Sequence, residues 1–409
     1  MTDTLRLVDW DLATATAIRL APRGPSVTRS DAFNAVRQLR RLAVEAEDHV
    51  AAFTGMAAGH AHDPANVVER SGWIEGNVGG FQVVMAPLLE KLAAKQAGKF
   101  GASLVTAVGS RAAGMQIGML LAYLSGKILG QYELFLPPDE GRTPDGRLTL
   151  VAPNIVAAER QLGADPRDFR LWVCVHEVTH RTQFTAVPWL RDHVVAEIGA
   201  FLAASDLDSA ELFRRLRSVG DAVRDTVRHR GPNDGDPAHA APAELPTLLE
   251  AVQTPEQRAI LNRLTAVMTL LEGHGEYVMN GVGPSVIPSV EEIGRKFSER
   301  RRGQNPADRL VRKLFGLDMK AKQYAEGATF VRAVVERVGM ASFNRVWTSP
   351  NTLPNRAEIA DPALWMKRVL RTAGPLIASD DALKNSGPAS DTNSGASDSA
   401  ASDSGPAAD

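Results

Sequence analysis

The sequence is short of cysteine, of excess charge and of long apolar runs, and each shortage excludes a class of protein. Cys174 is the single cysteine among 409 residues, so an intrachain disulfide is impossible and a reducing compartment is indicated. The net charge of −2 gives no basis for a nucleic acid or an anionic membrane as partner. The most apolar segment, "MQIGMLLAYLSGKIL" (115–129), is too short to span a bilayer and contains Gln116 and Lys127. Because the N-terminus also lacks an apolar signal region, we expect a cytoplasmic protein without a membrane partner.

Most of the sequence has the periodicity of helices. Hydrophobic residues make up 44% of the chain, which is enough for a sizeable core. Gly114 and Gly118 share one helical face and would let another helix come close. Residues 60–73 are expected to form a loop. Apolar positions at three- and four-residue intervals predict helices over 31–59, 73–95, 104–129, 190–228 (two helices), 254–280 and 305–340.

Two short stretches interrupt the helical pattern. "GQYELFLP" (130–137) and "GRLTLVAPNI" (146–155) are rich in β-branched and aromatic residues, and the segment between them is turn-forming. This arrangement predicts a β-hairpin. The fold class that we expect is therefore mainly α, with one small β element.

The composition changes near the C-terminus. From about Ser379 onward the chain consists almost entirely of Ser, Asp, Ala and Gly, with very little to bury. We predict a disordered tail over 376–409 and a single domain over 1–375. Within that domain, residues 1–129 form a helical part and residues 130–375 carry the metal site described next.

The stretch "WVCVHEVTHRTQF" (172–184) contains the motif H-E-x-x-H. A helix is predicted here, because Asp165 can cap its start, Pro166 suits its first position and Pro188 marks its end. Its residues before the motif are nearly all apolar, so the helix is expected to be buried. Buried histidines and glutamates need partners. We therefore favour a metal site over core polar residues that are satisfied by hydrogen bonds alone.

The spacing of the motif assigns a role to each of its polar residues. His176 and His180 lie one turn apart and project from one face, and neutral imidazole is a good ligand for zinc. Glu177 points about 100° away from His176 around the helix. It is therefore expected to act as general base toward a metal-activated water rather than as a ligand.

A zinc site needs a third ligand, and the sequence offers several candidates. The long metzincin continuation is excluded, because Gln183 and Ala186 stand where that pattern requires glycine and histidine. Glu197 and His193 lie nearby in the sequence, and Glu272 lies far away. Glu197 is better interpreted as a solvated residue of an amphipathic helix.

Local chemistry favours the distant candidate. Glu272 directly follows the apolar run "AVMTLL", where an unpaired carboxylate would be costly. Glu276 lies one turn later on the same face and is expected to hydrogen-bond a ligand histidine. For His274 we expect a loop-facing position or a supporting hydrogen bond, because its spacing does not indicate a ligand.

In combination, these segments resemble a known family. "VHEVTHRTQF" with the later "LLEGHGEYVM" is similar to the glutamate-type zincins. Together with "GWIEGNVGGF", "LGQYELFLP" and "MKAKQYAEGATFVRAVVERVG", the chain resembles the bacterial zincin-like metallopeptidase type 2 family over roughly residues 6–370. The branch most similar to it is labelled as associated with deazaflavin-coenzyme biosynthesis. The resemblance implies Zn²⁺ bound by His176, His180 and Glu272, with Glu177 as catalytic base.

Zinc peptidases also need a donor for the developing oxyanion. Tyr277, His274 and Tyr324 are of suitable type, and we select Tyr324 as the candidate. Cys174 is expected to be a small buried hydrophobe on the opposite side of the helix.

The predicted function is zinc-dependent hydrolysis of a peptide bond in a peptide or protein substrate. Two alternatives remain open. One is a metal-containing scaffold or binding protein without turnover, linked to coenzyme biosynthesis. The other is hydrolysis of an amide in a small metabolite.

Overall fold

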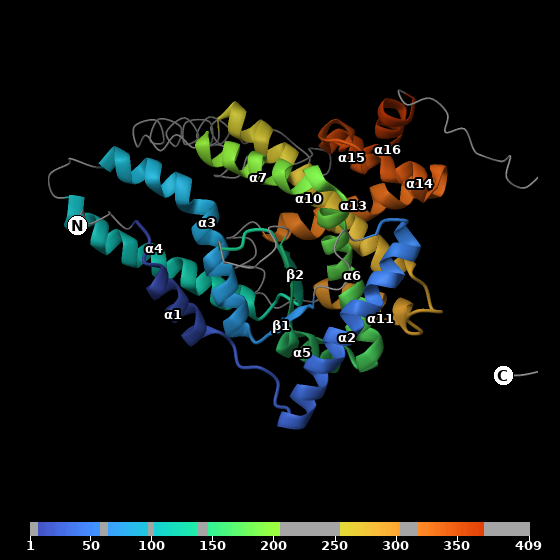
Figure 1. Cartoon of the computed structure of the whole chain (residues 1–409), viewed down its shortest axis with the longest axis horizontal. Coiled ribbons are helices and arrows are strands. Elements are labelled where there is room, and N and C mark those ends of the chain that lie inside the picture. Colours follow the sequence, from blue (N-terminus) through green and yellow to red (C-terminus); the bar gives the residue numbers. More distant parts are fainter. Residues whose placement is uncertain are drawn as a thin grey trace, which may run out of the picture.

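A small sheet lies at the centre of the protein, with helices on both sides of it (Figure 1). The computed structural model describes residues 7–57, 64–96, 102–137, 146–204, 254–302 and 317–371. The sheet has the order β1-β3-β2, in which β3 (Arg147–Val151) pairs parallel with β1 (Asn66–Val68) and antiparallel with β2 (Gly130–Glu133). The predicted hairpin is therefore confirmed, and β2 forms one edge of the described sheet.

Helices make up most of the rest of the described chain, which confirms the mainly α fold. The longer ones are α1 (Trp10–Leu20), α2 (Arg29–Thr54), α3 (Arg70–Gln96), α4 (Ala102–Ser125), α5 (Ala152–Leu162), α6 (Pro166–Ala186), α7 (Pro188–Ala203), α10 (Pro255–Gly281), α11 (Val290–Arg302) and α13 (Leu317–Val338). Short helices follow: α14 (Met340–Phe343), α15 (Arg356–Ala360) and α16 (Pro362–Trp365), with 3₁₀ turns at Asn344–Trp347 and Pro350–Thr352 and a π turn at Met366–Leu370. None of the described helices is long and apolar enough to cross a membrane.

Two sequence predictions need correction near the sheet. Residues 60–73 were expected to form a loop, but they include β1 and the start of α3. The strand that was expected to reach residue 155 ends at Val151, because Pro153 suits the first turn of α5 and cannot donate to a ladder. β1 is only three residues long and pairs with a strand distant in sequence, so no local sequence pattern predicts it.

The helix that contains the H-E-x-x-H motif begins where it was predicted to begin. The side chain of Asp165 accepts hydrogen bonds from the backbone N–H groups of Arg167 and Asp168, at 2.9 and 3.0 Å. α6 then runs to Ala186, just before Pro188 opens α7. α10 begins with a capping box formed by Thr254 and Gln257, so side-chain caps fix the starts of both α6 and α10.

Apolar packing holds α6 between α2 and α10. Cys174 of α6 is fully buried, and its thiol approaches the carbonyl oxygen of Leu39 on α2, which confirms its prediction as a buried hydrophobe. On the other side of the sheet, α1 crosses α4 closely. A Cβ at Gly114 would lie 2.4 Å from the carbonyl oxygen of Asp9, so the close approach expected at Gly114 and Gly118 is confirmed.

Some predictions fall outside the described residues. They are the turn of the hairpin, the second helix expected before residue 228, the start of the helix expected at 305 and the tail at 376–409. The assignment of residues 1–375 to a single domain stays a prediction.

Candidate metal centre

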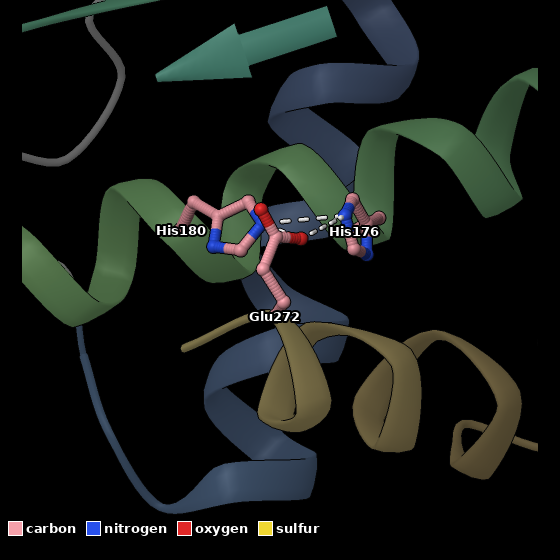
Figure 2. A group of neighbouring side chains, drawn as sticks. All are labelled: His176, His180 and Glu272. Atoms are coloured by element: carbon pink, nitrogen blue, oxygen red, sulfur yellow. Dashed lines mark hydrogen bonds and ion pairs between the residues drawn. The ribbon is translucent and has the colours of Figure 1, made fainter. Parts of the chain in front are cut away.

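The structure brings three predicted ligands together from two helices. His176 and His180 extend from α6, and the carboxylate of Glu272 reaches between them from α10 (Figure 2). The Nε2 atoms of His176 and His180 lie 3.2 Å apart. Oε2 of Glu272 lies 3.6 Å from Nε2 of His176 and 3.4 Å from Nε2 of His180. Among the described residues, they form the one group of three His, Cys, Asp or Glu side chains that could hold a metal ion.

The spacing of the three donor atoms fits a zinc ion. Zinc binds imidazole nitrogen and carboxylate oxygen at about 2.0–2.2 Å in tetrahedral geometry, which places neighbouring ligand atoms about 3.3 Å apart. The three separations here lie close to that value. Two imidazoles and one carboxylate are also a donor set that zinc accepts while keeping a fourth position for a substrate or water. The residues therefore fit a catalytic type of zinc site.

The charges of these groups are strongly coupled. Burial alone would lower the pKa of His180, but the facing Glu272 carboxylate outweighs it and raises this pKa to about 9. Burial alone would raise the pKa of Glu272, but the two histidines hold it well below its ordinary value. The Glu272 carboxylate therefore favours the protonated form of His180, so that a proton and a metal ion would compete for this imidazole.

Glu177 is placed beside the ligand group rather than within it. It is 5% exposed, and burial raises its pKa above the ordinary value, although the charges of His176 and His180 act in the opposite direction. A Cβ at Gly130, the first residue of β2, would lie 2.7 Å from Cγ of Glu177. The absence of a side chain at Gly130 thus allows the carboxylate to pack directly against the edge strand.

A cavity of about 260 Å³ lies beside the ligands. Its polar wall contains His176, Glu177 and Glu272, together with Lys127 and Glu276. Its apolar wall comes from Ile128, Leu129, Trp172, Val173, Met279 and Phe297, with Gly130. The cavity therefore offers a small and largely apolar space beside His176, Glu177 and Glu272.

Glu276 lines this cavity, but it does not hydrogen-bond Nδ1 of His176 or Nδ1 of His180, the ring nitrogens that face away from the ligand group. Nδ1 of His180 is paired with Oε1 of Gln183 at 2.9 Å, whereas Nδ1 of His176 is buried and has no hydrogen-bond partner among the described residues. The supporting role that we predicted for Glu276 is filled at His180 by Gln183. In the sequence, Gln183 served only to exclude the metzincin pattern, although its position three residues after His180 on a buried helix was a usable signal.

His274 and Gly275 complete the interface between the two helices. His274 is 1% exposed, its Nδ1 lies 3.0 Å from Nε2 of Gln183, and burial lowers its pKa to about 3. It is therefore a neutral, supporting residue and not loop-facing. A Cβ at Gly275 would lie 2.9 Å from Cε1 of His176 and 3.3 Å from Cε1 of His180. No local sequence pattern indicates this packing requirement.

The other candidates lie apart from the centre. Glu197 forms an ion pair with Arg263, with 2.8 Å between the closest atoms, and His193 packs against the ring of Trp189. Tyr277 packs against the ring of Phe53 and does not line the cavity.

Tyr324 falls within α13, but its side chain lies outside the described residues. Its role as oxyanion donor stays a prediction.

Comparison with known proteins assigns the chain to a family. The family of zincin-like metallopeptidases matches residues 8–366. The chain belongs to this family. A crystal structure from Chloroflexus aurantiacus, described as a candidate hydrolase with a novel fold, is 31% identical in sequence with a TM-score of 0.63. The match covers 89% of this chain and 99% of that one, whereas no curated protein matches.

The group of three candidate ligands is consistent with membership in this family. The family implies a divalent metal, typically zinc, and the His176, His180 and Glu272 group is the candidate for holding it. Family and structural neighbour together support assignment as a hydrolase. Neither identifies the substrate, and neither bears on the link to deazaflavin-coenzyme biosynthesis.

Proposed function

We propose that this zincin-like chain is a zinc-dependent hydrolase that cleaves a peptide bond, with Glu177 as general base. One observation carries the proposal. The three donor atoms of His176, His180 and Glu272 meet at zinc-like separations, and two of these residues, His176 and Glu272, line a cavity that Glu177 also lines. The ligands, the base and the space for a substrate thus share one place.

The residues of the chain divide the chemistry. When bound, zinc would polarise a substrate carbonyl and lower the pKa of a water molecule. The Glu177 carboxylate can accept a proton from the attacking water and return it to the leaving amine. Its burial supports this role, because a carboxylate with a raised pKa holds a proton more readily during transfer. The apolar wall formed by Trp172, Met279 and Phe297 would exclude bulk water.

The edge strand supports a peptide as substrate. β2 is an edge of the described sheet, and its first residue, Gly130, contacts Glu177. An extended peptide that adds to such an edge is held through main-chain hydrogen bonds. A peptide bound along β2 would pass close to Glu177.

The size of the cavity favours a second candidate, hydrolysis of a small-molecule amide. About 260 Å³ is below the range of about 300–1,000 Å³ that is typical of ligand pockets. A space of this size accommodates one substrate side chain or one small metabolite. A panel of small amides should therefore be tested beside peptides.

A scaffold without turnover is less well supported. In the described residues no fourth His, Cys, Asp or Glu joins the group, and a cavity rather than packed side chains lies beside it. A purely structural zinc site is usually closed by a fourth protein ligand. The open side of the group therefore favours catalysis.

Zinc content tests the ligand set. We expect His176→Ala and Glu272→Ala to lose zinc, measured by metal analysis of the purified proteins. Glu197→Ala is the matched control, because it removes a carboxylate that is paired with Arg263 away from the centre. Unchanged zinc content in both ligand variants would refute the site.

Activity tests the base. Glu177→Gln should retain zinc and lose about 10²–10⁴-fold in turnover, since that is the usual contribution of a general base. Screening of the zinc-loaded protein against peptide libraries and small amides provides the substrate. Equal cleavage by wild type and Glu177→Gln would exclude the proposed mechanism.

A further inference from the structure

A buried glutamine connects the two helices of the metal centre. Gln183 of α6 is 0% exposed and lies one turn after His180. Its Oε1 is 2.9 Å from Nδ1 of His180, and its Nε2 donates to the carbonyl oxygen of Leu271 at 3.0 Å. The same Nε2 lies 3.0 Å from Nδ1 of His274. One amide group therefore contacts three partners on α6 and α10.

The chemistry of these partners fixes the orientation of the amide. A backbone carbonyl can only accept, so the NH₂ end of Gln183 must face Leu271. The oxygen end must then face His180, and it can only accept. Nδ1 of His180 must therefore carry a hydrogen and donate it. In the neutral imidazole this leaves the lone pair on Nε2, the atom that faces His176 and Glu272.

His274 holds the amide in this orientation. The second hydrogen of the Gln183 NH₂ group points to Nδ1 of His274, which must accept it. The His274 ring is itself fixed by packing near Phe343 and Trp347, with ring centroids 5.4 and 5.5 Å away. If the Gln183 amide were flipped, its oxygen would face two acceptors, the carbonyl oxygen of Leu271 and Nδ1 of His274. Its NH₂ group would face the N–H of His180, which is also a donor. Only the observed orientation satisfies all three contacts.

The contact with Leu271 extends this control to the second helix. Leu271 immediately precedes the ligand Glu272, and both residues lie within α10. Gln183 therefore links the α10 backbone next to the ligand Glu272 with the imidazole ring of the α6 ligand His180. The hydrogen bond to Leu271 crosses an interface in which α10 packs so closely on the histidine rings, at Gly275, that a Cβ would not fit.

We propose that Gln183 is the positioning residue of the metal centre, which holds His180 in the tautomer with Nδ1–H and locks α10 in register with α6. The proposal rests on the proposed zinc site. It adds a residue that does not touch the metal or the substrate and acts through His180 and the backbone of Leu271.

Metal affinity tests the proposal. Gln183→Met keeps the length and burial of the side chain but removes all three hydrogen bonds. Thr182→Val is the matched control, because Thr182 is a buried polar residue of the same helix whose hydroxyl donates to the carbonyl of Val178 and to no other group in the described part of the chain. Zinc affinity is measured by competition with a chromogenic chelator. We expect a loss of about 10–100-fold for Gln183→Met, as for other groups that support a ligand, and no change for Thr182→Val. Equal affinities of wild type and Gln183→Met would overturn the proposal.

The tautomer can be observed directly in the wild type. ¹⁵N NMR of zinc-loaded, histidine-labelled protein should show Nδ1 of His180 as the protonated nitrogen, with a hydrogen that exchanges slowly. Coordination through Nδ1, or rapid exchange of that hydrogen, would overturn the proposal even if Gln183→Met failed to fold. Neither readout is catalytic. A protein that binds zinc in this way without cleaving any amide would refute the proposed function alone.

Discussion

Gly275 provides a sharp test of the geometry of the metal centre. A Cβ at this position would lie 2.9 Å from Cε1 and 3.0 Å from Nδ1 of His176, and 3.3 Å from Cε1 of His180. Carbon atoms in comfortable contact lie about 3.5–4.0 Å apart. The substitution Gly275→Ala therefore requires the rings, or α10 itself, to move by roughly half an ångström.

The cost should fall mainly on the zinc-bound state. Without metal, the rings of His176 and His180 are not tied to each other, and the ring of His176, whose Nδ1 has no hydrogen-bond partner among the described residues, can shift away from the new methyl group. With zinc bound, their Nε2 atoms must remain about 3.3 Å apart, so the rings cannot move independently. Overpacking of this kind costs about 1–3 kcal/mol. At about 1.4 kcal/mol per factor of ten, zinc affinity should fall by about 5–150-fold.

A second glycine separates this effect from helix propensity. Alanine in place of glycine within a helix stabilises the fold by up to about 1 kcal/mol. Gly199 of α7 has open space where a Cβ would be, so Gly199→Ala gains the propensity without a steric cost. Chelator competition should show weaker zinc binding for Gly275→Ala and wild-type binding for Gly199→Ala. Zinc binding that is equally tight in both variants would refute the close packing of α10 against the histidine rings.

Two further predictions concern proton release and a buried ion pair. Zinc must displace the proton that His180 holds with a pKa of about 9, so the logarithm of the apparent affinity should rise by about one per pH unit between pH 6 and 8 and level off near pH 9. Chelator competition over this range measures the slope, and a flat profile would contradict the protonated His180. Arg181 of α6 forms an ion pair with Glu47 of α2, and both side chains are buried. Arg181→Met leaves that carboxylate without this cation and should lower the free energy of unfolding by about 3–5 kcal/mol in urea denaturation, whereas a change below 1 kcal/mol would show that the pair contributes little.

The candidate ligands could be predicted because their residue types carry the chemistry. His176 and His180 share a face through helix geometry alone, and the apolar run before Glu272 marked a carboxylate that needed a partner. Helix ends were equally accessible, since Asp165 and Pro188 act through their own backbone neighbours. Local rules therefore sufficed to locate the start and the end of α6.

The contacts that the supporting residues make between distant segments could not be predicted in this way. Gln183 bonds to Leu271 and His274, which lie far along the chain, so its role exists only after α6 and α10 have packed. Glu276 has the type and spacing expected of a supporting residue, yet it lines the cavity while an amide occupies the expected place behind His180. β1 likewise depends on a parallel partner in β3. In each case the pairing of distant segments decides the role of the residue.

Residues without chemistry of their own set the geometry of this site. Gly130 of β2 makes room for the Glu177 carboxylate, and Gly275 of α10 makes room for the two imidazole rings. Each glycine lies on the element that packs against α6, at the point where a functional side chain emerges from it. A side chain at either position would have to displace the base or the ligands, because interiors have few voids into which they could retreat. The H-E-x-x-H motif and a distant glutamate therefore do not suffice to form the centre. β2 and α10 can pack this closely against α6 only because the residues at the two contact points, Gly130 and Gly275, have no Cβ.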